Sequence, residues 1–232
     1  MPSFNIVKKS NPDKTFRVSN VLNAFDLEIE KVKEHFQGSI DIEDKEWNIG
    51  LIVGGSGTGK TTIAKEVFGD HFMVYDYKES AVVDDMPKGK SIKEITKAFT
   101  SVGFASPPSW LKPYEVLSNG EKMRCDLANC ILQDKETIIF DEFTSVVNRE
   151  VAKTGSYAIS KAVRKMNKKF IAVGCHSDIT EWLEPDWVYN TDEQRFFFAQ
   201  KSTKDQKSSL KYLGLTTKIK KKYGECFASI TI

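Results

Sequence analysis

One glycine-rich stretch, Gly54–Thr61 (GGSGTGKT), limits most strongly what this chain can fold into. It fits the pattern G-x-x-x-x-G-K-[ST] at every fixed position, with the apolar run Ile49–Val53 before it and the helix-like segment Thr62–Phe68 after it. Glycines allow a loop to wrap its backbone N–H groups closely around phosphate oxygens. The following helix directs its first N–H groups and the positive end of its dipole at the same anion. The stretch therefore predicts a phosphate-binding loop.

Two side chains in this loop have expected roles of their own. Lys60 is predicted to reach the β- and γ-phosphates of a nucleotide, and Thr61 to offer its hydroxyl to Mg²⁺. A glycine-rich turn without a ligand is the alternative, but such a turn does not require lysine and threonine at these positions. The residues expected to bind the nucleotide here are Gly54, Gly55, Ser56, Gly57, Thr58, Gly59, Lys60, Thr61 and Thr62.

A pair of carboxylates follows another apolar run. The segment Ile138–Phe140 is too apolar for a surface loop, and Asp141 and Glu142 come directly after it. Phosphoryl transfer to water needs a carboxylate that holds the metal and a base for the attacking water. Asp141 is therefore predicted to bind the metal and Glu142 to act as the base. A solvated turn is the alternative, which the phosphate loop elsewhere in the chain disfavours.

Two further sites are predicted. His176 follows the apolar run 170–174, at the strand end where ligands of parallel sheets bind, and is expected to contact the γ-phosphate. Ser118-Asn119-Gly120-Glu121 has two interpretations. Ser-x-x-Glu before a helix is a capping box, whereas a serine, a glycine and a helix start together also form an anion site. In a two-fold dimer, that second site closes over the phosphate loop of the other subunit.

The order of apolar segments indicates an α/β fold, because buried strands that alternate with helices form a mainly parallel sheet covered on both faces. Residues 4–18 predict a short hairpin or edge strands rather than a helix. The other expected strands are 40–42, 49–53, 72–75, 81–83, 137–140, 170–174, 187–189 and 195–198, and the expected helices are 62–68, 91–100, 117–132 and 150–166.

Composition narrows the class of protein. The 232 residues are 40% apolar and 28% charged, and the net charge of +2 gives no global attraction to nucleic acid. Four cysteines (Cys125, Cys130, Cys175, Cys226) without C-x-x-C spacing indicate reduced thiols in a cytoplasmic protein. The N-terminus lacks the layout of a signal peptide, and no apolar run approaches the roughly 20 residues of a transmembrane segment.

In chain order, Gly54–Thr61, Leu117–Glu121, Ile138–Glu142, Ser145–Asn148 and His176 resemble the ABC-type ATPases, over residues 40 to 190 or so. The resemblance matches Lys60 and Thr61 to the Walker A residues and Asp141 to the Walker B aspartate. It matches Glu142 to the catalytic glutamate and His176 to the switch histidine. Ser118, Gly120 and Glu121 match the signature motif, whose leucine-serine-x-glycine pattern distinguishes this family from other P-loop enzymes.

A narrower resemblance and several departures accompany this match. Phe140–Val147 and Ser106–Leu111 are similar to the soluble ABC ATPases found fused to acetyltransferase-like domains. Asn119 and Glu121 replace the usual glycine and glutamine of the signature, and Asn148 stands where aspartate is usual. No glutamine lies between Thr62 and Ser118, so the usual Q-loop residue is missing. For the aromatic residue that stacks on adenine, Phe16 and Phe25 are candidates, with plain core positions as the alternative.

The resemblance implies a P-loop NTPase of ABC type: a mainly parallel sheet flanked by helices, an antiparallel N-terminal β portion and a reduced helical insert. We expect an ATPase domain over residues 1–200, with the insert at about 84–135, and a lysine-rich tail over 201–232. The implied cofactors are ATP and Mg²⁺, and the implied enzyme is a Mg-dependent nucleoside-triphosphate hydrolase.

Three hypotheses follow for its role. The first is a soluble ATPase that forms a head-to-tail homodimer around ATP and acts on an unidentified protein partner. The short insert and the missing glutamine favour it over the second, the ATPase subunit of a membrane transporter. The third is a nucleic-acid clamp switched by ATP, with the tail and the basic residues Lys161, Arg164, Lys165, Lys168 and Lys169.

Overall fold

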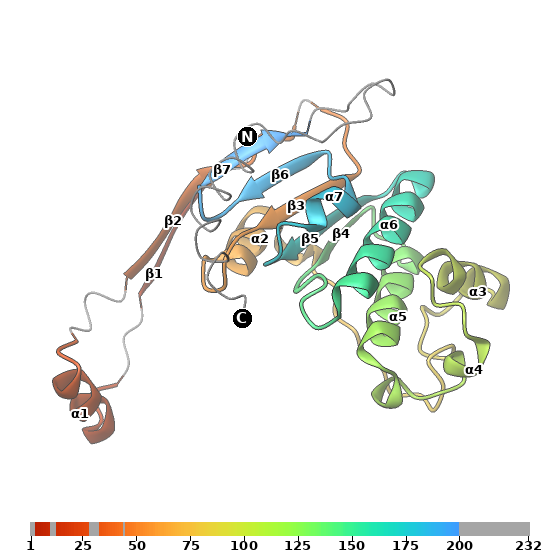
Figure 1. Cartoon of the computed structure of the whole chain (residues 1–232), viewed down its shortest axis with the longest axis horizontal. Helices are drawn as coiled ribbons and strands as arrows, with labels where there is room; N and C mark the ends of the chain where they lie inside the picture. Colours follow the sequence, from red (N-terminus) through yellow and green to blue (C-terminus); the bar gives the residue numbers. More distant parts are fainter. Residues whose placement is uncertain (1–2, 10–12, 28–32, 44, 200–232) are drawn as a thin grey trace, which may run out of the picture.

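The computed structural model describes residues 3–9, 13–27, 33–43 and 45–199. The predicted basic tail over 201–232 and Cys226 lie outside these residues. A five-stranded sheet in the order β4-β5-β3-β6-β7 forms the centre (Figure 1). Its first four strands are parallel and β7 pairs antiparallel with β6. The strands are β3 (Ile49–Val53), β4 (Thr137–Phe140), β5 (Lys169–Gly174), β6 (Trp187–Asn190) and β7 (Arg195–Phe198).

Both faces of the sheet are covered, as β3 shows most clearly, because all five of its residues are buried. Alternate side chains point to opposite faces, so Leu51 joins one core and Ile52 the other. The first core is shared with α5 (Asn119–Leu132), α6 (Arg149–Met166) and α7 (Ile179–Leu183). The second is shared with α2 (Lys60–Phe68), whose end is followed by the short turn η2 (Gly69–His71). No helix in the described residues is long and apolar enough to span a bilayer.

A helical insert lies beside α6, on the opposite side of the molecule from α2 (Figure 1). Its longest helix is α5, which packs against α3 (Ile92–Ser101) and α6. The predicted helix over 91–100 is confirmed, and Ser91 and Glu94 form a capping box at its start. The other insert elements are α3 (Ile92–Ser101), α4 (Pro107–Trp110) and η3 (Tyr114–Val116).

The N-terminal segment forms an arm that extends from the body (Figure 1). Strands β1 (Ser3–Lys9) and β2 (Lys33–Ser39) pair antiparallel, which confirms the antiparallel N-terminal portion. The helix α1 (Phe16–Ala24) lies at the far end of this arm. The prediction of no helix over residues 4–18 is therefore wrong for its last residues, because α1 begins at Phe16. The Thr15 side chain caps this helix by accepting a hydrogen bond from the Val18 N–H.

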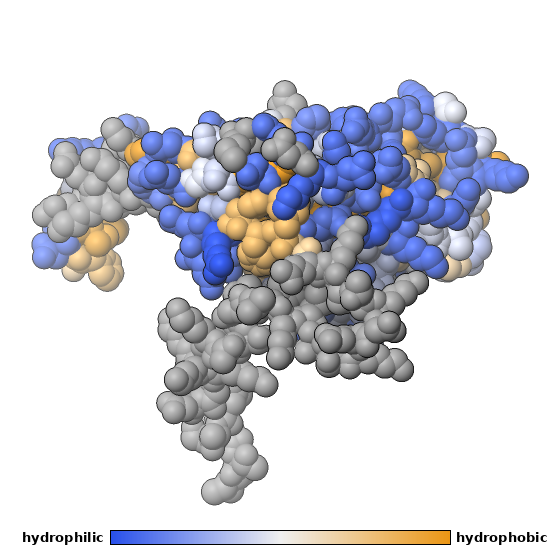
Figure 2. Space-filling view, turned by 90° about the horizontal axis from the view of Figure 1, so that it is seen from above, coloured by the Kyte–Doolittle hydropathy of each residue, from blue (hydrophilic) through white to orange (hydrophobic). Residues whose placement is uncertain are grey.

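The side chains of α1 correct another prediction. Phe16 is 83% exposed and Phe25 is 70% exposed, so neither is a core residue. The helix α1 lies at the far end of the arm from α2 (Figure 1). Figure 2 shows apolar surface at this end of the molecule and a second apolar patch near the centre of the same face, with mostly hydrophilic surface elsewhere.

Three predicted strands are wrong. Residues 40–42 are not a strand, because the strand ends at Ser39 and the buried Ile40 lies in the following loop. In 72–75, only Phe72 forms a β-bridge, to Ile139, and Val74 is 87% exposed. Residues 81–83 form a turn, although Val82 is buried. In each case apolar residues are buried or partly buried, but the segment forms no continuous ladder with a strand.

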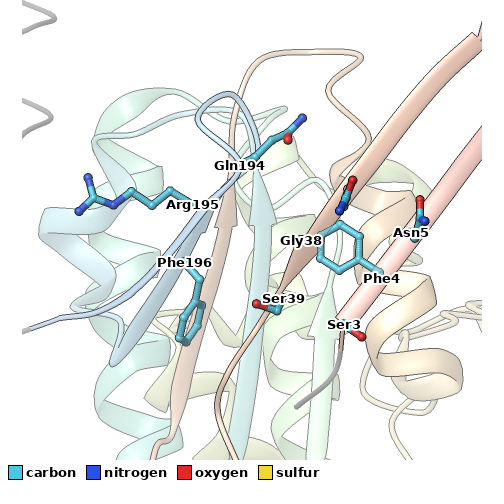
Figure 3. A pocket seen from close by; sticks show the side chains of 9 residues that line it. Ser3, Phe4, Asn5, Gly38, Ser39, Gln194, Arg195 and Phe196 are labelled. Atoms are coloured by element: carbon cyan, nitrogen blue, oxygen red, sulfur yellow. The ribbon is translucent and has the colours of Figure 1, made fainter.

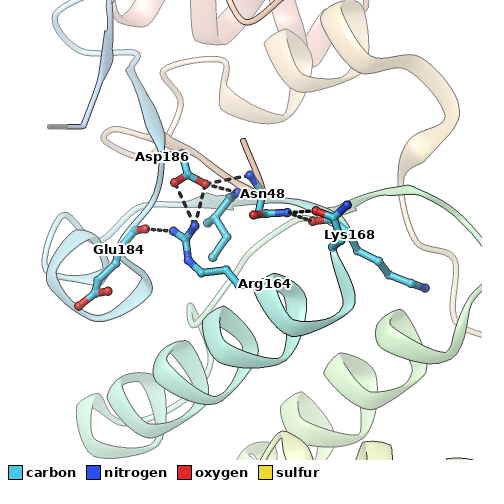
Figure 4. Close-up of polar contacts among 7 residues, drawn as sticks. Asn48, Arg164, Lys168, Glu184 and Asp186 are labelled. Carbon is cyan, nitrogen blue, oxygen red and sulfur yellow. Dashed lines mark hydrogen bonds and ion pairs between the residues drawn. The ribbon is translucent and has the colours of Figure 1, made fainter. Parts of the chain in front are cut away.

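A buried carboxylate ties the start of β3 to the start of β6 (Figure 4). Asp186, whose side chain is 8% exposed, accepts hydrogen bonds from the backbone N–H groups of Asn48 (2.8 Å) and Ile49 (2.9 Å). Arg164 of α6 donates to both Asp186 oxygens at 3.0 Å and to the Glu184 carbonyl oxygen at 2.5 Å. This network fixes α6 against the amino ends of two parallel strands.

Two other basic residues near the end of α6 also have intramolecular partners. Lys168 donates to the carbonyl oxygens of Ile131 and Gln133 at the end of α5. Lys169 lies 3.3 Å from a carboxylate oxygen of Glu136. Arg164, Lys168 and Lys169 therefore stabilise the fold. Of the five basic residues predicted for nucleic-acid binding, only Lys161 and Lys165 are exposed.

We predict that Asp186→Ala lowers the free energy of unfolding by about 3 kcal/mol, because it leaves two N–H groups without their acceptor and a guanidinium without its carboxylate partner. Urea denaturation measures this change. The control Lys161→Ala, an exposed change on α6, should stay within about 0.5 kcal/mol of the parent. Equal stability of the two variants would contradict the role given to Asp186.

Candidate functional site

The predicted phosphate loop lies at the carboxyl end of β3 and leads directly into α2. Lys60 Nζ donates to the Gly55 carbonyl oxygen at 2.5 Å, and Thr58 Oγ1 donates to the same oxygen at 2.8 Å. No side chain caps the start of α2. The loop is therefore closed on itself, and the first N–H groups of α2 keep their capacity to bind an anion.

Gly59 is required here for two reasons. Its φ of 81° lies in the left-handed region, which residues with a Cβ adopt at a cost. A Cβ at this position would also lie only 2.5 Å from the ring of Phe36 on β2. Phe36, which the sequence analysis did not single out, thus packs against the phosphate loop and helps to fix its shape.

The structure brings Thr61 and Asp141 together. Thr61 Oγ1 donates to Asp141 Oδ1 at 3.1 Å, across 80 positions of sequence. This contact follows from the sheet: β5 lies between β3 and β4, and Val53 pairs with Gly174 while Phe140 pairs with Ala172. The three strands end almost level, so the loops after them meet at one edge.

The buried neighbour Phe143 keeps the Glu142 side chain exposed to solvent. Phe143 is fully buried among Phe140 and Phe170, and its N–H donates to the Val173 carbonyl oxygen at 2.8 Å. The backbone on both sides is left-handed, with φ of 52° at Glu142 and 66° at Thr144. A left-handed backbone costs a residue with a Cβ roughly 1–2 kcal/mol of stability, and here two of three consecutive residues adopt it. The buried ring stabilises this turn, which exposes the Glu142 side chain at the sheet edge.

His176 lies on the loop after β5, between the loops that carry Lys60 and Asp141. Its side chain is exposed. The segment around it is joined to the start of α6, because Arg149 Nε donates to Asp178 Oδ2 at 2.9 Å and a second guanidinium nitrogen binds Oδ1. Arg149 also lies over the Trp182 ring, at 5.0 Å from its centroid. These contacts connect the loop of His176 with the segment Ser145–Asn148.

The segment Ser118–Glu121 forms the predicted capping box at the start of α5. Glu121 accepts hydrogen bonds from Ser118 N (2.9 Å), Ser118 Oγ (2.7 Å) and Ser109 Oγ (2.6 Å). The Ser109 hydroxyl and the Ser118 groups lower the pKa of Glu121 to about 2. Its carboxylate is therefore engaged within its own chain. Ser118 is exposed, and α5 lies away from α2 (Figure 1), so its use as an anion site stays a prediction about a second subunit.

The turn between β6 and β7 contacts the phosphate loop, which the sequence analysis missed. The Gly55 N–H donates to both carboxylate oxygens of Asp192, at 3.0 and 3.1 Å. Thr58 Oγ1 and Thr191 Oγ1 lie 2.6 Å apart, and the Thr191 N–H donates to the Val53 carbonyl oxygen. A negative charge therefore lies at the loop that is expected to bind phosphates.

A cavity of about 740 Å³ opens beside this turn, between β7 and the β1–β2 arm (Figure 3). Gln194 and Arg195, just after Asp192, form one side, and Gln37 and Gly38, just after Phe36, form the other. Amide and hydroxyl groups line much of it. The lining residues are Ser3, Phe4, Asn5, Gln37, Gly38, Ser39, Gln194, Arg195 and Phe196.

The chain matches no protein-family model, and no curated protein is similar to it in sequence. Among solved structures, the dimeric MJ0796, a bacterial ABC transporter cassette, is similar with a TM-score of 0.57, at 12% identity over 73% of this chain and 94% of that one. CbiO1 of Clostridium perfringens, part of the ABC transporter complex CbiONQ, gives a TM-score of 0.55, at 17% identity over 71% of this chain and 80% of that one.

The fold is that of an ATP-binding cassette. A third similar structure, a bacterial Atm1-family ABC exporter with ATP bound, has a TM-score of 0.51 and 18% identity over 65% of this chain and 33% of that one. The predicted fold class is thereby confirmed. At these identities the likeness concerns the fold alone.

We predict that Asp192→Asn strengthens the binding of a nucleoside triphosphate by a few-fold. The variant keeps an oxygen acceptor for the Gly55 N–H, but it removes a negative charge that repels the negatively charged phosphates. The expected gain in binding free energy is about 1 kcal/mol. Titration calorimetry measures the affinity, and Glu136→Gln, which alters an exposed carboxylate at the amino end of β4, is the matched control. Weaker binding by Asp192→Asn would contradict the prediction and show that the charge itself shapes the loop.

Proposed function

We propose that this chain binds and hydrolyses ATP with Mg²⁺, and that two copies close head to tail around the nucleotides. The contact of Thr61 Oγ1 with Asp141 Oδ1 at 3.1 Å carries this proposal. It joins the end of the phosphate loop to the carboxylate after β4, with Glu142 exposed one residue later. An ordinary strand-to-helix turn has no reason to bring these groups to one point.

The donor set at this point fits Mg²⁺. The ion prefers oxygen ligands and is usually held by one or two protein groups together with phosphate oxygens. Thr61 and Asp141 supply a hydroxyl and a carboxylate, and no group of three or more His, Cys, Asp and Glu side chains forms a metal site in the described part of the chain. When bound there, the ion would neutralise charge on the phosphates.

The neighbouring residues have distinct proposed roles. Lys60 moves from the Gly55 carbonyl oxygen to the phosphates, and the N–H groups of residues 56–62 bind their oxygens. Glu142 takes the proton of the attacking water, and the anchored Phe143 keeps it in position. His176 contacts the γ-phosphate from the loop after β5. The departing phosphate then no longer holds this loop.

A dimer explains the exposed residues that a single subunit does not use. Ser118 and Gly120 lie at a helix start remote from their own phosphate loop, as a site in trans requires. Val116, beside this segment, is 64% exposed, and Val146, in the segment after Glu142, is 68% exposed. Apolar side chains next to both segments favour burial against a second copy.

We further propose the domain division given above, a soluble cytoplasmic protein and a protein partner. The similar transporter cassettes favour a transporter ATPase as the second candidate, and co-purification with a membrane protein would support it. The nucleic-acid clamp is less favoured, because Arg164, Lys168 and Lys169 have intramolecular partners. ATP-dependent retention of DNA or RNA that weakens with salt would restore it.

We predict that Glu142→Gln lowers the rate of ATP hydrolysis by at least about 100-fold, the usual contribution of a general base, and leaves ATP affinity unchanged. Phosphate release and equilibrium binding measure the two quantities. Glu66→Gln, an exposed change on α2, is the matched control and should hydrolyse ATP normally. Hydrolysis at the parent rate by Glu142→Gln would remove Glu142 from the mechanism.

Lys60→Ala should instead lose ATP affinity, because it removes the cation that faces the phosphates. We expect binding at least about tenfold weaker than in the control Lys97→Ala, an exposed change on α3. Equal ATP affinity of the two variants would count against the phosphate-loop assignment.

A further inference from the structure

A buried carboxylate in α5 has no part in the chemistry described above. Asp126 Oδ1 accepts a hydrogen bond from Tyr77 Oη at 2.8 Å, and Oδ2 accepts one from Tyr114 Oη at 2.9 Å. The two tyrosine rings are stacked, with centroids 4.0 Å apart and planes within 9°. Each carboxylate oxygen thus receives one phenol, and the three side chains form one cluster, called here the Asp126 cluster.

The cluster retains its charge against the cost of burial. Burial raises the pKa of Asp126 to about 6, while the hydrogen bonds from Tyr77 and Tyr114 and the charge of Lys122 oppose this shift. At neutral pH the carboxylate is therefore still ionised, although a neutral side chain would be buried more cheaply. The other titratable groups nearby are Tyr75, Asp85, Cys125 and Cys130.

The segment 72–77, which includes Tyr77 of the cluster, connects the cluster with β4, the strand directly before Asp141. The Met73 N–H donates to the Ile139 carbonyl oxygen at 3.3 Å, and Phe72 forms a β-bridge with Ile139. Two residues after Met73, Tyr75 packs against Phe140 and its hydroxyl lies 2.8 Å from Cys130 Sγ on α5. The segment 72–77 therefore lies on β4 at one end and on α5 at the other.

Both ends of this connection lead to the proposed nucleotide site. β4 continues into Asp141 and Glu142, and α5 begins directly after Ser118. Tyr114 lies in η3, four residues before Ser118, so the cluster also holds the segment that leads into the start of α5.

We propose that Asp126, together with Tyr77 and Tyr114, is a positioning group that sets the start of α5, and thus Ser118 and Gly120, relative to Asp141 of the same chain. The proposal rests on the function proposed above, since the start of α5 matters only if it meets the nucleotide of a second subunit. The ionised carboxylate holds both phenols at once. Protonation turns one carboxyl oxygen into a donor and removes the charge that strengthens both hydrogen bonds, so it weakens the hold on the two phenols.

The first test removes the hydroxyls but keeps the stacked rings. In the Glu142→Gln protein, Tyr77→Phe and Tyr114→Phe should each weaken the Mg-ATP-dependent dimer about tenfold, as loss of a hydrogen bond to a charged group implies. ATP affinity of the monomer should not change. Sedimentation equilibrium measures the dimer, and Tyr157→Phe, an exposed tyrosine of α6, is the matched control. Dimers as stable as the control would overturn the proposal.

The second test compares how folding stability and dimer stability depend on pH, because a positioning role and a purely structural role of Asp126 predict trends of opposite sign for the dimer. The raised pKa of Asp126 means that its effect on folding is most favourable in acid and becomes less so as pH rises through about 6. Lowering pH from about 7.5 to about 5.5 should therefore favour folding through this group but weaken the dimer. Asp126→Asn should remove both trends, and the same dimer trend in both proteins would overturn the proposal.

Hydrogen exchange keeps the inference testable if no dimer forms. Absence of an ATP-dependent dimer in Glu142→Gln itself would refute the proposed function, not the cluster. Amide exchange over residues 114–124 should still be faster in the Tyr77→Phe, Tyr114→Phe double variant than in Tyr157→Phe. Unchanged exchange there would show that the cluster does not position the start of α5.

Discussion

The level ends of three parallel strands are the constraint on which the rest of this structure depends. β5 pairs with β3 on one side and β4 on the other, so the loops that carry Lys60, His176 and Asp141 meet at one edge. The two cores hold this register from opposite faces, and the Asp186 network fixes it at the amino ends. The edge that results brings together the predicted phosphate loop, a carboxylate pair and the loop of His176.

The sequence predicted those parts of the fold whose signals are local. The apolar strands at 49–53, 137–140 and 170–174, the helix over 91–100 and the capping box at Ser118 are encoded within a few residues of each element. The wrong strand at 72–75 shows the limit of this reasoning. Phe72 is partly buried and forms a single bridge with Ile139 of β4, but the pairing does not continue and Val74 is 87% exposed.

In the candidate site too, local sequence patterns predict some residues and only the tertiary structure reveals the others. Motif spacing pointed to Lys60, Thr61, Asp141 and Glu142, since each follows a recognisable strand. Asp192 and Asp126 carry no such signal, because their partners are 137 and 49 positions away in the sequence. Only the tertiary structure places Asp192 on the phosphate loop and two phenols on Asp126. These contacts surround the predicted residues with charge and hydrogen bonds that determine how tightly the loop and α5 are held.

The mass in solution of the Glu142→Gln variant, with and without Mg-ATP, tests the central claim most directly. We predict the 26.3 kDa monomer without nucleotide and a dimer of twice that mass with it. A monomer that binds ATP but never dimerises would contradict the proposed closure. It would leave Ser118 and Glu121 with the capping role that the structure already gives them.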